Sequence, residues 1–169
     1  MIRILTIFVA AAILWPSFAT AAPKPLIQNP KHWGAFELKE KAGKACYMVG
    51  KPVETAPKNV RRGDIWLLVT HRPAGKIKNE VQVIVGYTFK NGSAATITID
   101  GKKFTLFTEK DAAWADSAKD DNKLVAAMRK GNKLIVRGVS SRGTKTTDRY
   151  NLSGFSAAHA AIGKACGVK

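Results

Sequence analysis

Cys46 and Cys166, the two cysteines of the chain, are the residues best placed to react with each other. In an oxidising compartment an even pair of cysteines favours a disulfide, which here would join an early segment to the end of the chain. The chain-entropy model assigns roughly 4 to 5 kcal/mol to closing a loop of about 120 residues, before native strain is subtracted. The alternative is two free, buried thiols. We expect the disulfide Cys46–Cys166.

Hydrolytic and metal chemistry have no recognisable motif in this sequence. It contains no G-x-S-x-G nucleophile elbow, Gly-rich phosphate loop, C-x-x-C or H-E-x-x-H. The three histidines, His32, His71 and His159, have no second ligand at metal spacing. Ser140, His71 and Asp148 would form a nucleophilic triad only if distant segments brought them together. We expect no enzyme activity, no metal, no cofactor and no small-molecule substrate.

Three further patterns have both a functional and a structural interpretation. Arg62-Gly63-Asp64 matches the tripeptide that integrins recognise, but so short a match is common by chance, and we expect Gly63 to turn the chain before a strand. Trp33, Trp66 and Trp114 could stack on sugars, yet Trp66 lies in the most apolar segment, so we expect it in the core; the role of Trp114 stays open.

Asp148 alternates with Tyr150 and Leu152 along a predicted strand, which places its carboxylate on the inner face. A buried carboxylate needs a partner, and Arg72 or Arg142 is the partner we expect.

The formal charge of +16 makes a charged partner plausible. Nucleic acid is the usual partner of so basic a protein, but an exported protein meets little of it, and the basic residues here are dispersed. We therefore expect an envelope polymer, a membrane surface or a host-cell surface component. The alternative is that the lysines only solvate the protein. The candidate contacts are Arg72, Lys76, Lys78, Arg142, Lys145 and Arg149.

Residues 1–21 have the features of a secretory signal peptide. Arg3 precedes an apolar run over residues 4–15, and residues 19–21 form an A-x-A cleavage pattern. A membrane anchor is the weaker alternative, because spanning roughly 30 Å of hydrocarbon takes about 20 residues. We expect cleavage between Ala21 and Ala22, since cleavage one residue later would place Pro23 at the scissile bond. This predicts a protein of the periplasm or outer envelope.

The mature chain must position these residues on short strands. Residues 22–32 carry three prolines and are predicted to be a flexible arm, followed by a single domain over residues 33–169. Residues 65–70 form an apolar run, which predicts a central strand buried on both faces. Asn91-Gly92 and Asp100-Gly101 predict hairpin turns, so that residues 80–107 form a meander. The predicted strands cover 34–39, 45–49, 65–70, 80–87, 96–99, 103–107, 133–139 and 144–152, and the predicted helices cover 120–130 and 156–164.

This pattern predicts a mainly β, single-domain β-sandwich of the immunoglobulin-like type with two short helices. The strand order and the oligomeric state stay open.

Ordered blocks of residues over about 33–168 resemble the invasion-associated locus B family of alphaproteobacteria. The blocks are residues 62–64, 69–73, 79–81, 86–89, 99–108, 113–115, 124–129, 141–144, 150–158 and 164–166. The resemblance implies an exported β-sandwich protein of the periplasm or outer envelope, with a role in host-cell entry among pathogenic relatives. It implies no enzyme, because the family has no accepted catalytic residues, and it supports the disulfide. The alternative function is a general envelope or stress protein that contacts anionic cell-wall or lipopolysaccharide polymers, with no host role.

Overall fold

A single antiparallel sheet dominates the computed structural model, which describes residues 22–27 and 32–168. Within these residues, 11 strands are hydrogen-bonded in the order β1-β2-β3-β5-β6-β9-β8-β7-β10-β11-β4. The strands are β1 (Lys24–Pro25), β2 (Trp33–Glu40), β3 (Gly43–Gly50), β4 (Glu54–Ala56), β5 (Trp66–Arg72), β6 (Ile77–Ile84), β7 (Ala95–Ile99), β8 (Lys102–Glu109), β9 (Ala112–Trp114), β10 (Lys133–Val139) and β11 (Lys145–Asn151). The helices are α1 (Ala118–Lys130), α2 (Phe155–Cys166) and the 3₁₀ turn η1 (Pro73–Gly75).

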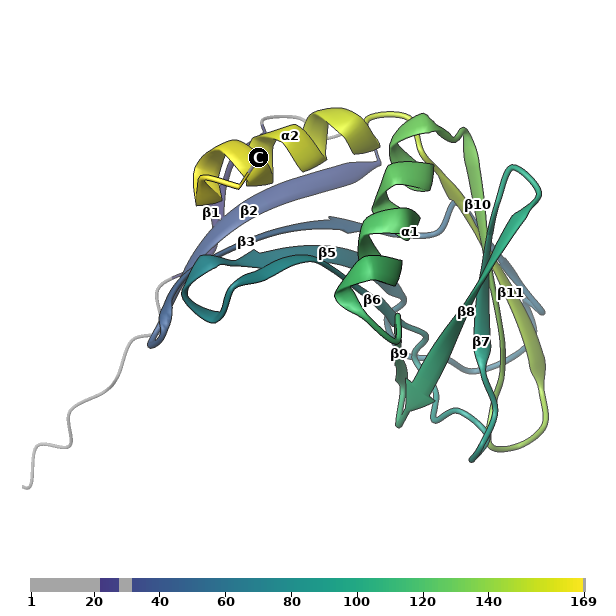
Figure 1. Ribbon diagram of the computed structural model, residues 1–169. Coiled ribbons are helices and arrows are strands. Elements are labelled where there is room, and N and C mark those ends of the chain that lie inside the picture. Colours follow the sequence, from purple (N-terminus) through teal and green to yellow (C-terminus); the bar gives the residue numbers. More distant parts are fainter. Residues whose placement is uncertain (1–21, 28–31, 169) are drawn as a thin grey trace, which may run out of the picture.

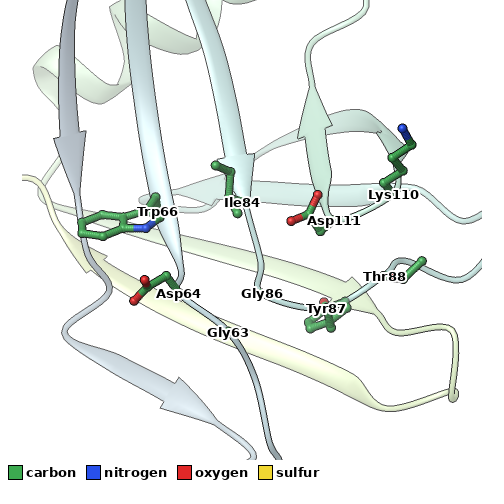
Figure 2. Close-up of a pocket in the computed structure, with 9 residues that line it drawn as sticks. All are labelled: Gly63, Asp64, Trp66, Ile84, Gly86, Tyr87, Thr88, Lys110 and Asp111. Carbon is green, nitrogen blue, oxygen red and sulfur yellow. The ribbon is translucent and has the colours of Figure 1, made fainter. Parts of the chain in front are cut away.

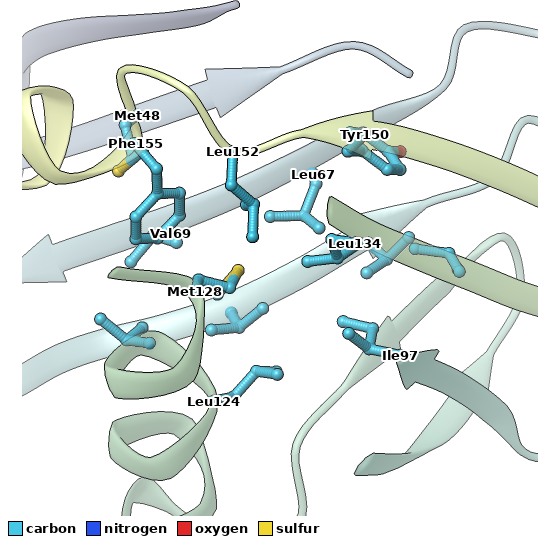
Figure 3. Packing of buried hydrophobic residues seen from close by; sticks show 14 of the residues in the cluster. Met48, Leu67, Val69, Ile97, Leu124, Met128, Leu134, Tyr150, Leu152 and Phe155 are labelled. Carbon is cyan, nitrogen blue, oxygen red and sulfur yellow. The ribbon is translucent and has the colours of Figure 1, made fainter. Parts of the chain in front are cut away.

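The sheet curves strongly, and both α-helices lie on its concave side (Figure 1). Helix α2 packs on β2, β3 and β5, and α1 packs on β6. The core fills the space between the helices and the sheet (Figure 3), where Met128 and Leu124 of α1 and Phe155 of α2 are buried with Val69 and Leu67 of β5. The concave face and the two helices therefore form one continuous core.

The prediction of a mainly β protein with two helices is confirmed, but the predicted sandwich of two sheets is not what the described strands form. The cause is β8, which pairs with two neighbours in succession: residues 102–106 pair with β7, and residues 107–109 pair with β9. Because β8 pairs with β7 along one part of its length and with β9 along the other, the hydrogen bonds run through a single curved sheet. The helices, rather than a second sheet, cover the inner face.

Three local predictions are corrected. Residues 80–107 do not form a meander, because β6 pairs with β5 and β9 while β7 pairs with β8 and β10. Consequently Asn91-Gly92 is a turn between strands that do not pair, whereas Asp100-Gly101 does close the β7–β8 hairpin. The predicted arm is partly attached to the sheet, since β1 pairs with β2 and Leu26 packs against the core. The predicted signal peptide, Ala21 included, lies outside the described residues.

Strand β5 is fully buried on one face, whereas on the opposite face only Thr70 is buried. Leu67 and Val69 point into the core, while Trp66 and Leu68 are partly exposed on the other face. Although the run is apolar throughout, burial alternates from Trp66 to Val69, which is the pattern of a half-buried antiparallel strand. This places Trp66 on the outer surface rather than in the core, contrary to the prediction.

Both predicted helices are present, but α1 begins two residues before the predicted start at 120, and α2 extends from 155 to 166 instead of 156 to 164. Ser117 caps α1 by accepting a hydrogen bond from the backbone N–H of Asp120, and Asp120 and Asp121 lie in the first turn, where the helix dipole favours acids. Helix α1 ends at Gly131, whose backbone is extended with a ψ of 166°. Only glycine fits at this position, because a Cβ there would lie 2.5 Å from Cγ2 of Ile99. Helix α2 ends at Gly167, which has a left-handed φ of 65°.

Candidate functional site

An open surface groove with a volume of 610 Å³ lies where β5 begins and β6 ends (Figure 2). We call it the Trp66 groove; it is lined by Gly63, Asp64, Trp66, Ile84, Gly86, Tyr87, Thr88, Lys110 and Asp111. Trp66 and Ile84 face each other as a cross-strand pair. Lys110 and Asp111 form the turn from β8 to β9, with Lys110 at a φ of 53°. Three separate segments, residues 63–66, 84–88 and 110–111, therefore build one surface.

The floor of the groove is a close contact between two glycine backbones. The Gly63 N–H donates to the Gly86 carbonyl at 2.8 Å. Gly86 has a φ of 69°, and a Cβ on it would collide with the carbonyl oxygen of Gly63. Only glycine allows both this conformation and this approach.

Replacing Gly86 with alanine is therefore expected to lower the free energy of unfolding by about 1 to 3 kcal/mol. Gly92→Ala is the matched control, because Gly92 has the same φ of 69° and a Cβ added there would have nothing within 4 Å. Urea unfolding followed by circular dichroism measures both. If Gly86→Ala lowers the free energy of unfolding no more than Gly92→Ala does, the tight contact at Gly86 is contradicted.

Beside the groove lies a buried ion pair between Arg62 and Asp148. The guanidinium donates to both carboxylate oxygens at 2.7 Å, and the two side chains are 7% and 1% exposed. The guanidinium also donates to the Val85 carbonyl from Nε and Nη2 and lies 5.1 Å from the Tyr87 ring centroid. The expected need of Asp148 for a partner is met, but the partner is Arg62, not Arg72 or Arg142.

The same geometry gives Arg62-Gly63-Asp64 a structural role. The Arg62 guanidinium is fully engaged inside the protein, and Asp64 is exposed beside Lys51, with 3.9 Å between the carboxylate and the ammonium. An adhesive tripeptide must offer both charged side chains to its receptor. Here Arg62 is committed to the fold, which agrees with the structural interpretation of the motif.

Trp66 provides the aromatic surface of the groove. Its indole ring is partly exposed, and the Lys51 ammonium lies 4.1 Å from the ring centroid. Together with Asp64, Lys110 and Asp111, this gives two positive and two negative charges around one ring. The groove is thus locally balanced in charge on a chain whose formal charge is +16.

The other two tryptophans have structural partners. Trp33 is buried, meets the Phe155 ring edge-on at 5.0 Å, and donates from its indole N–H to the Asn151 carbonyl at 2.9 Å. Trp114 stacks on Phe107 with 5.6 Å between ring centroids, and Phe107 is 45% exposed. Trp33 therefore supports the core, while Trp114 lies at the surface far along the chain from Trp66.

The six predicted basic contacts fall into two groups. Arg72, Lys76 and Lys78 lie at the β5–β6 turn, at the left in Figure 1, and Arg142, Lys145 and Arg149 belong to the β10–β11 hairpin, at the right. Arg72 bonds to Glu80 at 2.7 Å and Arg149 lies 3.8 Å from Glu54. Lys76, Arg142 and Lys145 are exposed. These residues do not form a single basic face.

Ser140, His71 and Asp148 each have a partner outside the considered triad. The Ser140 hydroxyl accepts from the Thr144 N–H, His71 Nδ1 accepts from the Asn79 N–H, and Asp148 binds Arg62. In the part of the chain that the structure describes, no group of three or more His, Cys, Asp or Glu side chains could hold a metal ion. Over the same residues, no helix has the length and apolarity needed to cross a membrane.

The predicted disulfide Cys46–Cys166 is present and spans a sequence separation of 120. Residues 33–163 match the family model described as invasion associated locus B (IalB) protein. The chain belongs to the IalB family. No curated protein and no solved structure matches it. The matched range includes the whole Trp66 groove and ends within α2, so the groove and the Arg62–Asp148 pair are parts of the IalB region itself.

Proposed function

We propose that this IalB protein is exported and acts as a non-enzymatic binding protein of the bacterial envelope, taking a saccharide segment of an envelope or host-cell polymer in the Trp66 groove. Export is supported by the leader-like residues 1–21 and by the disulfide, a bond that persists in oxidising compartments.

The observation that carries the proposal is the partly exposed indole of Trp66 in an open groove. An aromatic ring offers a flat apolar surface to the C–H face of a sugar, while carboxylates and hydroxyls orient its OH groups. Asp64, Asp111 and Thr88 supply those groups here. The balanced charges disfavour a polyanion inside the groove, so a neutral, hydroxyl-rich segment fits it best.

Replacing Trp66 with alanine is expected to weaken saccharide binding at least tenfold, since a stacked aromatic anchor contributes about 1.4 kcal/mol or more. The protein is titrated by calorimetry with solubilised peptidoglycan fragments, chitotetraose and lipopolysaccharide. Trp114→Ala is the matched control, because Trp114 lies on the same face of the sheet but does not line the Trp66 groove and stacks on Phe107 instead. Equal affinities for the Trp66→Ala variant and the unaltered protein would refute the groove as the binding site.

A second candidate function rests on the exposed Lys76, Arg142 and Lys145. In this alternative, the protein contacts anionic cell-wall or lipopolysaccharide polymers through its basic ends and has no host role. Such binding would weaken steeply with salt and with neutralisation of Lys76 and Lys78, while Trp66→Ala would leave it unchanged. The same titrations, repeated at two salt concentrations, separate the two functions.

A further inference from the structure

Beneath the helices, on the opposite side of β5 from the Trp66 groove, Asn79 joins four elements at one buried point. Its backbone N–H donates to His71 Nδ1 of β5 at 3.0 Å, and its side-chain amide donates to Asn122 Oδ1 of α1 at 2.7 Å. Its Oδ1 lies 2.8 Å from His159 Nε2 of α2. Asn79 holds a left-handed φ of 60°, next to a register shift between β5 and β6. The two helices are thus bonded to the sheet through one residue of β6.

The hydrogen bonds fix the protonation state of His71. Because Nδ1 accepts the Asn79 N–H, it carries no proton, and the proton of the neutral ring lies on Nε2, which is buried with no partner among the described residues. A second proton would have to go to Nδ1, where it would face the N–H of Asn79. Protonating His71 therefore breaks its bond to Asn79.

The surroundings of His159 oppose a charge as well. Its ring lies 5.5 Å from that of His71 and stacks on Phe155 at 6.2 Å. Burial lowers the pKa of His159 to about 4, with further lowering from His71, Arg129 of α1 and Lys78 of β6. Burial, followed by Lys78, also lowers the pKa of His71. The two rings are thus neutral at pH 7 and repel each other once protonated.

The remaining charged groups near these rings do not supply a counter-charge. On β2 and β3, Glu37 pairs with Lys44 at 3.3 Å, and the sulfurs of the adjacent disulfide do not titrate. On α1, Asp121 accepts the Val81 N–H at 2.9 Å, and burial raises the pKa of its carboxyl to about 6. A carboxyl whose pKa is raised in the folded state adds stability as the pH falls. Protonation of Asp121 therefore partly offsets the stability that protonation of the two histidines removes.

We propose that Asn79, His71 and His159 form an acid-sensitive latch, which holds α2 on the sheet at neutral pH and releases the first turns of that helix in acid. The disulfide lies at the last residue of α2, so Cys166 stays attached to β3 and acts as the hinge. Release uncovers the apolar face under Phe155. The latch does not involve the Trp66 groove, so either proposal can fail without the other.

The direction of the pH dependence follows from the difference between the folded and unfolded pKa values. A histidine whose pKa is lower in the folded state contributes stability that is complete above its unfolded value near 6.5 and is lost as the pH falls toward about 4. Hydrogen exchange of the oxidised, full mature protein, corrected for intrinsic rates, is expected to show α2 amides near His159 opening at least about tenfold more at pH 4 than at pH 7. Amides of β10 and β11 are expected to change much less.

Histidine NMR titration tests the same latch without any substitution. His71 and His159 are both expected to titrate below the ordinary histidine pKa of about 6.5. In the double variant His71→Asn with His159→Gln, both side chains keep a hydrogen-bonding group but cannot be protonated, and the acid opening of α2 is expected to disappear. His32→Gln is the control and should retain it. Titration of both His71 and His159 near pH 6.5, or unchanged α2 protection at pH 4, would overturn the proposal.

Discussion

Asp148→Ala is expected to lower the free energy of unfolding by about 3 to 5 kcal/mol. The substitution leaves the Arg62 guanidinium buried without its carboxylate, and the 2.7 Å bonds to both oxygens are lost. Part of the charge would still be met by the Val85 carbonyl. Urea unfolding at pH 7 measures the loss.

The control for this prediction removes both charges together. Arg62→Met with Asp148→Leu replaces the pair by apolar side chains and is expected to recover much of the lost stability, since no unpaired charge remains. A double variant as unstable as Asp148→Ala alone would show that shape, rather than charge pairing, dominates at this point. A loss below about 1 kcal/mol for Asp148→Ala would place the pair among weak surface ion pairs.

Reduction of Cys46–Cys166 is expected to cost about 2 to 5 kcal/mol, the second large effect. The bond closes a loop with a sequence separation of 120, so its loss frees most of the unfolded chain. It also detaches the end of α2 from β3. Thermal unfolding with and without reductant measures the change.

The double variant Cys46→Ala with Cys166→Ala is the control for the reductant. Its melting temperature should lie near that of the reduced protein and should not respond to reductant. If complete reduction leaves the melting temperature of the unaltered protein unchanged, the disulfide contributes little to stability. Packing of Phe155 and Ile162 alone then holds α2 in place.

Local patterns along the sequence predict most individual elements, because periodicity, turn residues and helix caps act over a few residues. The end of α1 follows from the glycine at 131, its start lies two residues before the one that Asp120 and Asp121 predict, and the β7–β8 hairpin follows from Asp100-Gly101. The sheet order cannot be predicted in the same way. It depends on β8 changing partner at residue 107, which is a long-range choice with no local signal.

The Trp66 groove is not predicted from the sequence, for a different reason. The apolar run that begins at Trp66 suggests burial on both faces, yet its alternation with Leu67 and Val69 already assigns Trp66 to the opposite face. The partner of Asp148 is not predicted because Arg62 lies in a loop, where no periodicity indicates direction. Its place before Gly63 is the available signal, since that glycine allows the loop to approach β6 closely.

Helix α2, the last element of the chain, lies across β2 and β3, which are among the first. Residues 155–166 must therefore be synthesised before the inner layer over these early strands can form. A chain cut short by its final dozen residues would leave the early strands uncovered and prone to aggregation.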